Sequence, residues 1–133
     1  MNGDLGMGLF ERFKKKKQSV FIFDEGNDVY SAKINGVHFT CEKILDHYDQ
    51  IAYDLANAYE KKLPMIINFI SPDIKAMFDV EDKDIIKQSL GTPLIDLDRF
   101  VLSYLEHTFD HIHIIDVEFD GVFEKLLYSS IDG

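Results

Sequence analysis

The C-terminal stretch from residue 100 to residue 131, FVLSYLEHTFDHIHIIDVEFDGVFEKLLYSSI, constrains the fold of this chain more than any other segment. It is rich in β-branched and aromatic residues that alternate with polar ones, and the alternation is interrupted at residues 108–110 and at Asp120-Gly121. Period-two runs between turn residues are typical of β-strands. The stretch therefore predicts three antiparallel strands around which the rest of the chain is arranged.

The dipeptide Asp120-Gly121 predicts the register of the last hairpin. A two-residue type I′ turn needs positive φ at both central positions, which Asp tolerates and Gly adopts freely. In that register Asp116 lies opposite Lys125. A three-residue turn beginning after His107 completes the predicted meander.

The inferred registers give the C-terminal strands two mixed faces. Tyr104, Ile114 and Leu127 share one face with charged residues between them, and the clustered histidines gather at one end of the other face. An antiparallel sheet with one solvated face alternates cleanly, and this one does not. We therefore expect the apolar surface around Tyr104, Ile114 and Leu127 to bind a protein partner or a second copy of the chain.

The N-terminal half begins with strands between residues 19 and 39. Residues 20–23 are apolar at every position, which predicts a strand covered on both faces. Residues 24–28 form a turn, and Asn35-Gly36 predicts a second type I′ hairpin.

The middle of the chain is predicted to be helical. A long amphipathic helix runs from an N-cap at Thr40 to about Lys62, and residues 65–70 fit either a strand or a helical turn, of which we favour the helix. Short helices follow, one from Ser71-Pro72 to residue 78 and one from about residue 80 to a stop at Gly91. The predicted class is α+β, an antiparallel sheet from N-terminal and C-terminal strands with one long helix and several short helices in the middle.

Charge divides the chain into a basic start and an acidic remainder. The net charge is −10, but residues 1–17 carry +3 and the remaining residues −13. An acidic body repels nucleic-acid phosphates, so we expect no nucleic-acid partner. One cysteine and no apolar run near the ~18 residues of a membrane span favour a cytoplasmic protein. Residues 1–18 are predicted to be a flexible basic arm, and residues 19–133 a single domain.

The basic arm combines aromatic and basic side chains. Apolar residues that insert into lipid and lysines that attract anionic headgroups together favour contact with a membrane surface, although a solvated arm is the alternative. The residues of this arm site are Phe10, Phe13, Lys14, Lys15, Lys16 and Lys17.

Three of the five histidines, His107, His111 and His113, lie within seven residues of one another. On neighbouring strands their imidazoles could converge on one Zn²⁺, leaving the fourth position for a water that is activated for hydrolysis. The alternative is that they lie near a turn, solvated or hydrogen-bonded to acidic neighbours. No HExxH-type signature supports the metal site.

Acidic residues also alternate along two predicted strands, at Asp116, Glu118 and Asp120 and at Asp96 and Asp98. Paired carboxylates serve glycoside hydrolysis only when burial raises one pKa, and nothing in the sequence indicates such burial. We interpret them as a solvated face or a surface for a basic partner.

The segment from about Asp79 to the end contains VEDKDIIKQSLGTPLIDLD, YLEHTFD, IIDVEFDG and a terminal IDG in this order. It resembles a family of small bacterial proteins that carry a domain of unknown function. The resemblance covers about two-fifths of the chain and implies a bacterial, cytosolic, single-domain protein, but it assigns no catalytic residue.

We therefore expect a non-catalytic protein-interaction module that requires no cofactor, either immunity-like or regulatory. The alternative is a metal-dependent hydrolase that uses zinc at the three histidines. The sequence contains no GxSxG, Walker or GxGxxG motif.

Overall fold

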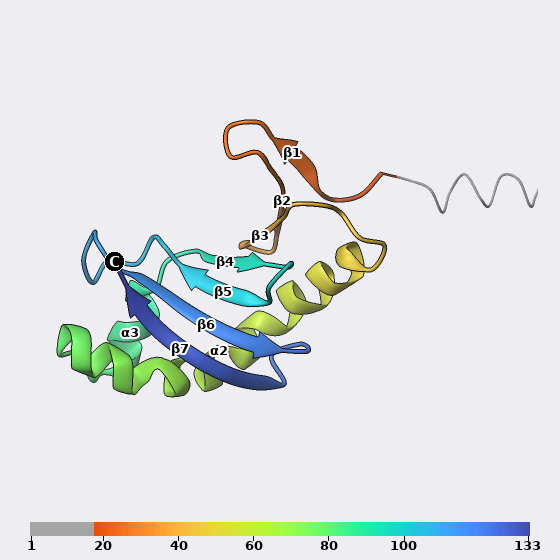
Figure 1. The fold of residues 1–133 in the computed structure, drawn as a ribbon. Helices are drawn as coiled ribbons and strands as arrows, with labels where there is room; N and C mark the ends of the chain where they lie inside the picture. Colours follow the sequence, from red (N-terminus) through yellow and green to blue (C-terminus); the bar gives the residue numbers. More distant parts are fainter. Residues whose placement is uncertain (1–17) are drawn as a thin grey trace, which may run out of the picture.

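A computed structural model describes residues 18–133 as one seven-stranded sheet with two helices (Figure 1). The predicted arm site at residues 10–17 lies outside the described residues. The strands are β1 (Ile22–Asp24), β2 (Val29–Ile34), β3 (Val37–Cys41), β4 (Pro93–Asp96), β5 (Val101–Tyr104), β6 (Ile114–Asp120) and β7 (Lys125–Asp132). Helices α2 (Tyr48–Phe78) and α3 (Lys83–Ser89) connect β3 to β4.

The strands follow one another across the sheet in sequence order, from β1 at one edge to β7 at the other. All neighbours are antiparallel except β3 and β4, which run parallel because the helices carry the chain back between them. The predicted α+β class is therefore confirmed, and the predicted antiparallel pairing holds for every pair of neighbouring strands except β3 and β4.

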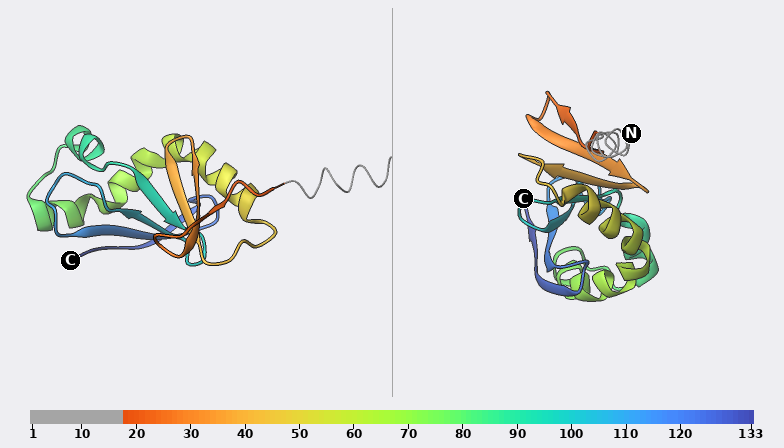
Figure 2. Two further views of the ribbon diagram at one scale, coloured as in Figure 1. Left: turned by 90° about the horizontal axis from the view of Figure 1, so that it is seen from above. Right: turned by 90° about the vertical axis from the view of Figure 1, so that its right-hand side faces the viewer.

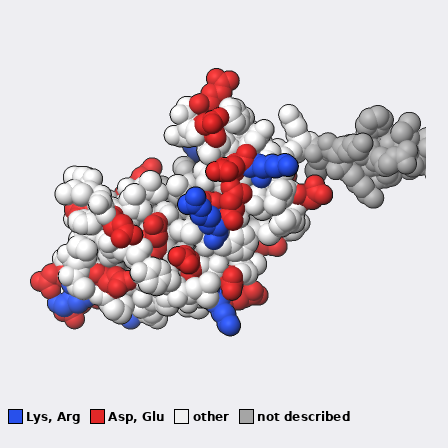
Figure 3. All heavy atoms as spheres, viewed as in Figure 1, with Lys and Arg blue, Asp and Glu red and all other residues white. Residues whose placement is uncertain are grey.

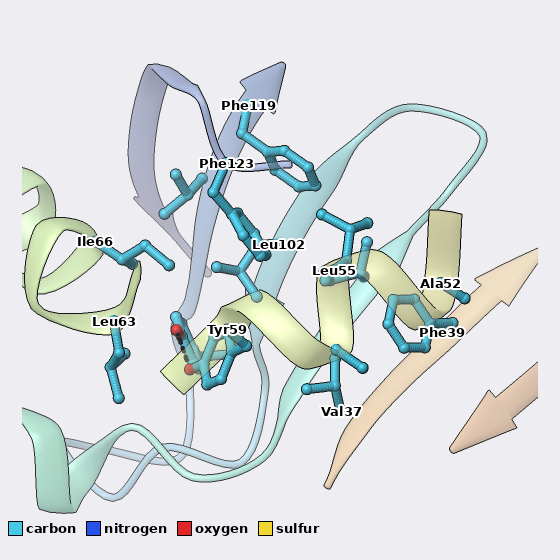
Figure 4. Close-up of a cluster of buried hydrophobic side chains, with 14 of the residues drawn as sticks. Val37, Phe39, Ala52, Leu55, Tyr59, Leu63, Ile66, Leu102, Phe119 and Phe123 are labelled. Carbon is cyan, nitrogen blue, oxygen red and sulfur yellow. Dashed lines mark hydrogen bonds between the residues drawn. The ribbon is translucent and has the colours of Figure 1, made fainter. Parts of the chain in front are cut away.

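The sheet curves around α2, so that its two faces have different environments (Figure 2). The inner face packs on α2, where side chains such as Phe39, Leu55, Ile66, Leu102 and Phe119 are almost completely buried (Figure 4). The outer face of β4 to β7 carries no helix within residues 18–133 (Figures 1 and 2). We call this uncovered surface of β4 to β7 the open face.

The helical middle differs from the prediction, because residues 48–78 form one helix instead of several. Thr40 is not its N-cap but lies within β3, and Pro64 and Pro72 both lie inside α2, which bends along its length in Figure 1. A proline inside a helix costs about 3 kcal/mol. The four isoleucines buried beyond Pro64 stabilise the folded state by about 1.5–3 kcal/mol each, which offsets both prolines. They are Ile66, Ile67, Ile70 and Ile74.

Helix α3 is the only short helix that the structure describes, and it ends as predicted. The side chain of Asp82 caps it by accepting hydrogen bonds from the backbone N–H groups of Asp84 and Ile85. Gly91 follows the C-cap residue with φ +76°. This left-handed conformation is the one that glycine adopts most readily at the end of a helix.

The hairpin at Asn35-Gly36 is confirmed. Ile34 lies opposite Val37, and the two residues between them have φ values of 51° and 82°. By contrast, the predicted burial of residues 20–23 on both faces is wrong, because β1 is an edge strand and Ile22 is 73% exposed.

The predicted turn at Asp120-Gly121 is also wrong. Residues 121–124 form a four-residue loop, with Asp120 opposite Lys125, and a register shift follows between Glu118 and Phe119. The longer loop lets Phe123 turn inward, where its ring lies 4.7 Å from that of Phe119. Burial of this aromatic side chain therefore overrides the local turn preference.

The register between β5 and β6 is shifted by one residue from the prediction, so the predicted faces are wrong as well. Tyr104 lies opposite Ile115 and Leu102 opposite Val117, and all four side chains are buried. A one-residue shift exchanges the faces of a strand. Residues 105–113 form a long loop here instead of the predicted short turn, and we call them the histidine loop.

No helix among residues 18–133 has the length and apolar character needed to cross a membrane.

Candidate functional site

The open face of β4 to β7 contains a hollow of about 370 Å³. Four carboxylates line it, and we call it the acidic hollow. They come from three different strands: Asp96 from β4, Asp116 and Glu118 from β6, and Asp132 from β7.

The observed registers bring these side chains together. Asp96 lies opposite Val101, which lies opposite Glu118, which in turn lies opposite Tyr128. Residues directly opposite each other on adjacent strands point to the same face of a sheet. One row of side chains therefore crosses four strands on the open face.

A parallel row of small polar residues borders the first. Ser103, Asp116 and Ser130 lie opposite one another on β5, β6 and β7. The hydroxyl of Ser103 donates to Asp116 Oδ1 at 2.5 Å, and that of Ser130 donates to Asp132 Oδ2 at 3.0 Å. These serines orient two of the four carboxylates without neutralising them.

Among the residues that the structure describes, Arg99 is the one cation that lines the acidic hollow. Its Nε lies 4.0 Å from Asp96 Oδ2, and its side chain is mostly exposed. An exposed ion pair at that separation is worth at most about 1 kcal/mol. The hollow therefore keeps a net negative charge. Figure 3 shows the same excess of acidic over basic side chains across this side of the molecule.

The chemistry of the acidic hollow is that of a cation-binding surface. Its carboxylate and hydroxyl oxygens can accept hydrogen bonds from ammonium and guanidinium groups. Tyr128, which is 59% exposed, places an aromatic ring beside these oxygens. No cysteine or histidine of the described part of the chain lines the hollow. Glu118 and Asp132 are exposed, and Asp96 and Asp116 are half-buried. A glycosidase acid is enclosed, so that burial raises its pKa.

The histidine loop holds His107 by both ring nitrogens. Its Nε2 lies 2.6 Å from the backbone oxygen of His113, and its Nδ1 accepts a hydrogen bond from the backbone N–H of Phe109. Only 1% of its side chain is exposed, and the ring packs on Phe78 at the end of α2. His107 therefore anchors the loop to the helix.

The imidazoles of His111 and His113 do not form a ligand cluster with that of His107 among the described residues. His113 Nδ1 lies 2.5 Å from Asp110 Oδ2, while His111 is exposed. The backbone N–H of His113, helped by its side chain and by the N–H of Ile112, lowers the pKa of Asp110 to about 2. Among residues 18–133 no group of three His, Cys, Asp or Glu side chains is arranged to hold a metal ion. The zinc hypothesis stays a prediction, and the geometry of these three side chains supplies no ligand set for it.

The three predicted partner-binding residues have separate locations. Tyr104 is fully buried on the inner face, where its hydroxyl lies 2.5 Å from that of Tyr59 in α2 (dashed line in Figure 4). Ile114 and Leu127 are 38% and 50% exposed on β6 and β7. Tyr104 therefore belongs to the core, because the shifted register turned it inward.

Cys41 is not positioned as a nucleophile. It lies buried in β3, and burial, followed by the nearby carboxylate of Asp98, raises its pKa to about 11. A thiol with a raised pKa supplies little thiolate at neutral pH.

Sequence reasoning identified the carboxylates of Asp96, Asp116 and Glu118 but not the neighbours that complete the hollow. Ser103 and Ser130 were missed, although both are polar residues within strand patterns. A correct register between β5, β6 and β7 would have placed them beside Asp116.

Comparison of the chain with protein-family models, with curated proteins and with solved structures gave no match. The resemblance of the C-terminal segment to a bacterial family therefore stays a prediction.

Proposed function

We propose that this protein is a non-catalytic protein-interaction module that binds a basic segment of a partner protein in the acidic hollow. The observation that carries the proposal is the gathering of four carboxylates from three strands in one hollow, on a sheet face that no helix of residues 18–133 covers. Charged residues in complementary arrangement steer association and select partners.

The chemistry of the hollow favours lysine and arginine side chains as its occupants. Asp116 and Glu118 present unpaired negative charge, and Tyr128 adds a ring that stacks on a guanidinium. The charge of −13 on residues 18–133 extends the attraction beyond the contact itself.

A direct test measures binding of a fluorescent oligolysine peptide by anisotropy at low and at physiological salt. In the double variant Asp116→Asn/Glu118→Gln, the loss of about 0.5–1 kcal/mol per charge predicts about five- to thirtyfold weaker binding. The same peptide, titrated into labelled protein, should shift the amide resonances of β4 to β7 before those of α2.

The matched control is Asp46→Asn/Glu60→Gln, which removes the same charge from exposed positions outside the acidic hollow. It should retain most of the affinity, because only the general field changes. Equal losses in the two variants would show that the peptide follows net charge alone and would overturn the assignment of the hollow.

A further inference from the structure

Strand β7 is a long strand at the edge of the sheet. It spans eight residues, and within residues 18–133 its one pairing partner is β6. Among residues 18–133, no backbone hydrogen bond outside the regular elements involves a β7 residue. Edge strands of natural proteins are usually shortened or protected by proline or inward-pointing charge. This strand has no proline, and its charged residues lie only at its ends, at Lys125 and Asp132.

A second hollow borders β7, apart from the acidic hollow on the open face. It measures about 340 Å³ and lies between β7 and the last turns of α2. We call it the edge groove. Asp73, Ala76 and Met77 of α2 line it together with the C-terminal half of β7, and the hydroxyl of Ser129 donates to Asp73.

The edge groove and the acidic hollow share Tyr128, Ser130 and Asp132 of β7. The edge of β7 therefore lies between two concave surfaces. A strand sends alternate side chains to opposite faces, so a strand added to this edge would reach both surfaces at once.

We propose that the partner adds an extended basic strand to the free edge of β7, with lysine or arginine side chains directed toward the acidic hollow and apolar side chains directed toward Met77 and Ala76. This inference rests on the proposed function and specifies how the partner is held. Main-chain hydrogen bonds to β7 supply affinity, and the two surfaces select alternating basic and apolar residues.

The negative charge around β7 favours a basic strand of another protein over a second copy of this chain as the occupant of the edge. Asp73 and Asp132 line the edge groove, and no lysine or arginine among residues 18–133 does. Two copies joined at β7 would bring two acidic hollows and two bodies of −13 together, which opposes self-association.

The test uses three short, end-blocked peptides in which lysine alternates with valine. One is unmodified, one is N-methylated at every valine, and one is N-methylated at every lysine. All three have the same charge and side chains, but the methylated residues cannot donate a main-chain hydrogen bond. Loss of several such bonds should weaken binding by about tenfold or more.

Only one set of alternate N–H groups in an added strand faces β7. One methylated peptide should therefore lose affinity, while the other binds like the unmodified peptide. In the same titration, hydrogen exchange of alternate β7 amides should slow. Equal affinity of all three peptides, or equal loss in both methylated ones, overturns strand addition.

A protein variant tests the edge groove directly. Ala76→Lys adds a positive charge to its wall, and Gln88→Lys adds the same charge on α3 outside it. The first should weaken binding of the unmodified peptide by about fivefold, from about 1 kcal/mol of charge repulsion, and the second by less than about twofold. Comparable effects of the two variants contradict the location.

The outcomes separate this inference from the proposed function. If N-methylation has no effect but Asp116→Asn/Glu118→Gln weakens binding, the acidic hollow stands and strand addition fails. If no lysine-containing peptide binds, the proposed function itself fails. A dimeric mass without peptide, with β7 amides already protected, would show that a second copy occupies the edge and would overturn the inference.

Discussion

Replacing Gly91 with alanine should destabilise this domain much more than the same change at Gly36. Both glycines have positive φ, +76° and +82° respectively. An added Cβ at Gly36 would meet nothing within 4 Å, whereas at Gly91 it would lie 2.6 Å from the backbone oxygen of Glu106. The comparison therefore separates backbone strain from steric displacement of the histidine loop.

The magnitude follows from these contacts. Left-handed backbone costs an L-residue about 1–2 kcal/mol, which is the whole expected effect at Gly36. At Gly91 the loop must also move away from α3, where the N–H of Thr108 donates to the oxygen of Ser89 at 2.8 Å. Loss of that hydrogen bond adds about 1 kcal/mol, and repacking adds about 1–3 kcal/mol. We expect about 3–6 kcal/mol in all.

Urea unfolding followed by far-ultraviolet circular dichroism measures the free energy of unfolding for the parent and both variants. Alanine has fewer unfolded conformations than glycine, which changes the free energy of unfolding of both variants by the same amount. This contribution therefore cancels when the two variants are compared. A difference of about 2 kcal/mol should separate their midpoints by about 1 M urea.

Equal destabilisation by the two alanine substitutions would refute the reasoning. If Gly91→Ala does not fold, Gly91→Asn and Gly36→Asn repeat the comparison with a residue that tolerates positive φ. The asparagine at position 91 should still be the more destabilising of the two, because its Cβ meets the same backbone oxygen.

Four further predictions concern hydrogen-bonded polar side chains. Tyr104→Phe should cost about 1–3 kcal/mol by leaving the hydroxyl of Tyr59 without its partner, and the double variant with Tyr59→Phe should cost less than the sum of the single changes in urea unfolding. Burial raises the pKa of Tyr59 to about 12 and that of Tyr104 well above 10, so the folded state holds these protons more tightly. Stability should therefore fall as pH rises from about 10 to about 12, and Tyr59→Phe/Tyr104→Phe should flatten that fall. The pH dependence that Asp110 contributes to stability has the opposite sign, because folding lowers the pKa of this carboxyl from 3.8 to about 2. The stability it contributes is present above about pH 4 and is lost as pH falls toward 2. The variant Asp110→Asn should remove this dependence from acid-unfolding curves. His107→Ala should destabilise the protein by about 2–4 kcal/mol, because it leaves a cavity and removes two hydrogen bonds. His111 is exposed, so His111→Ala should change stability by less than about 0.5 kcal/mol. If the purified protein contains stoichiometric zinc and both variants lose it, the metal hypothesis is supported instead.

Local sequence signals determined the features that depend on a few adjacent residues. Asn35-Gly36 specified a tight hairpin, because these two residues tolerate positive φ without tertiary support. Gly91 marked the end of α3 for the same reason. Alternation of residue types indicated the presence and direction of β5, β6 and β7.

Only tertiary packing decided the continuity of the long helix. Pro64 and Pro72 are helix breakers by local preference, and the sequence therefore predicted separate helices. Both prolines lie on the exposed side of α2, and the apolar stripe continues past them onto the sheet. The burial gained across the whole helix exceeds the local cost, and no window of a few residues contains that comparison.

Tertiary structure also decided the composition of the candidate site. The sequence placed Asp116 and Glu118 on one strand face and suggested a basic partner for them. Which residues stand beside them depends on strand register, and register followed from the burial of Phe123 and Tyr104 against α2. Because a shift of one residue exchanges the two faces of a strand, residue types alone determined that this protein has an acidic sheet surface, and long-range packing determined where its hollow lies.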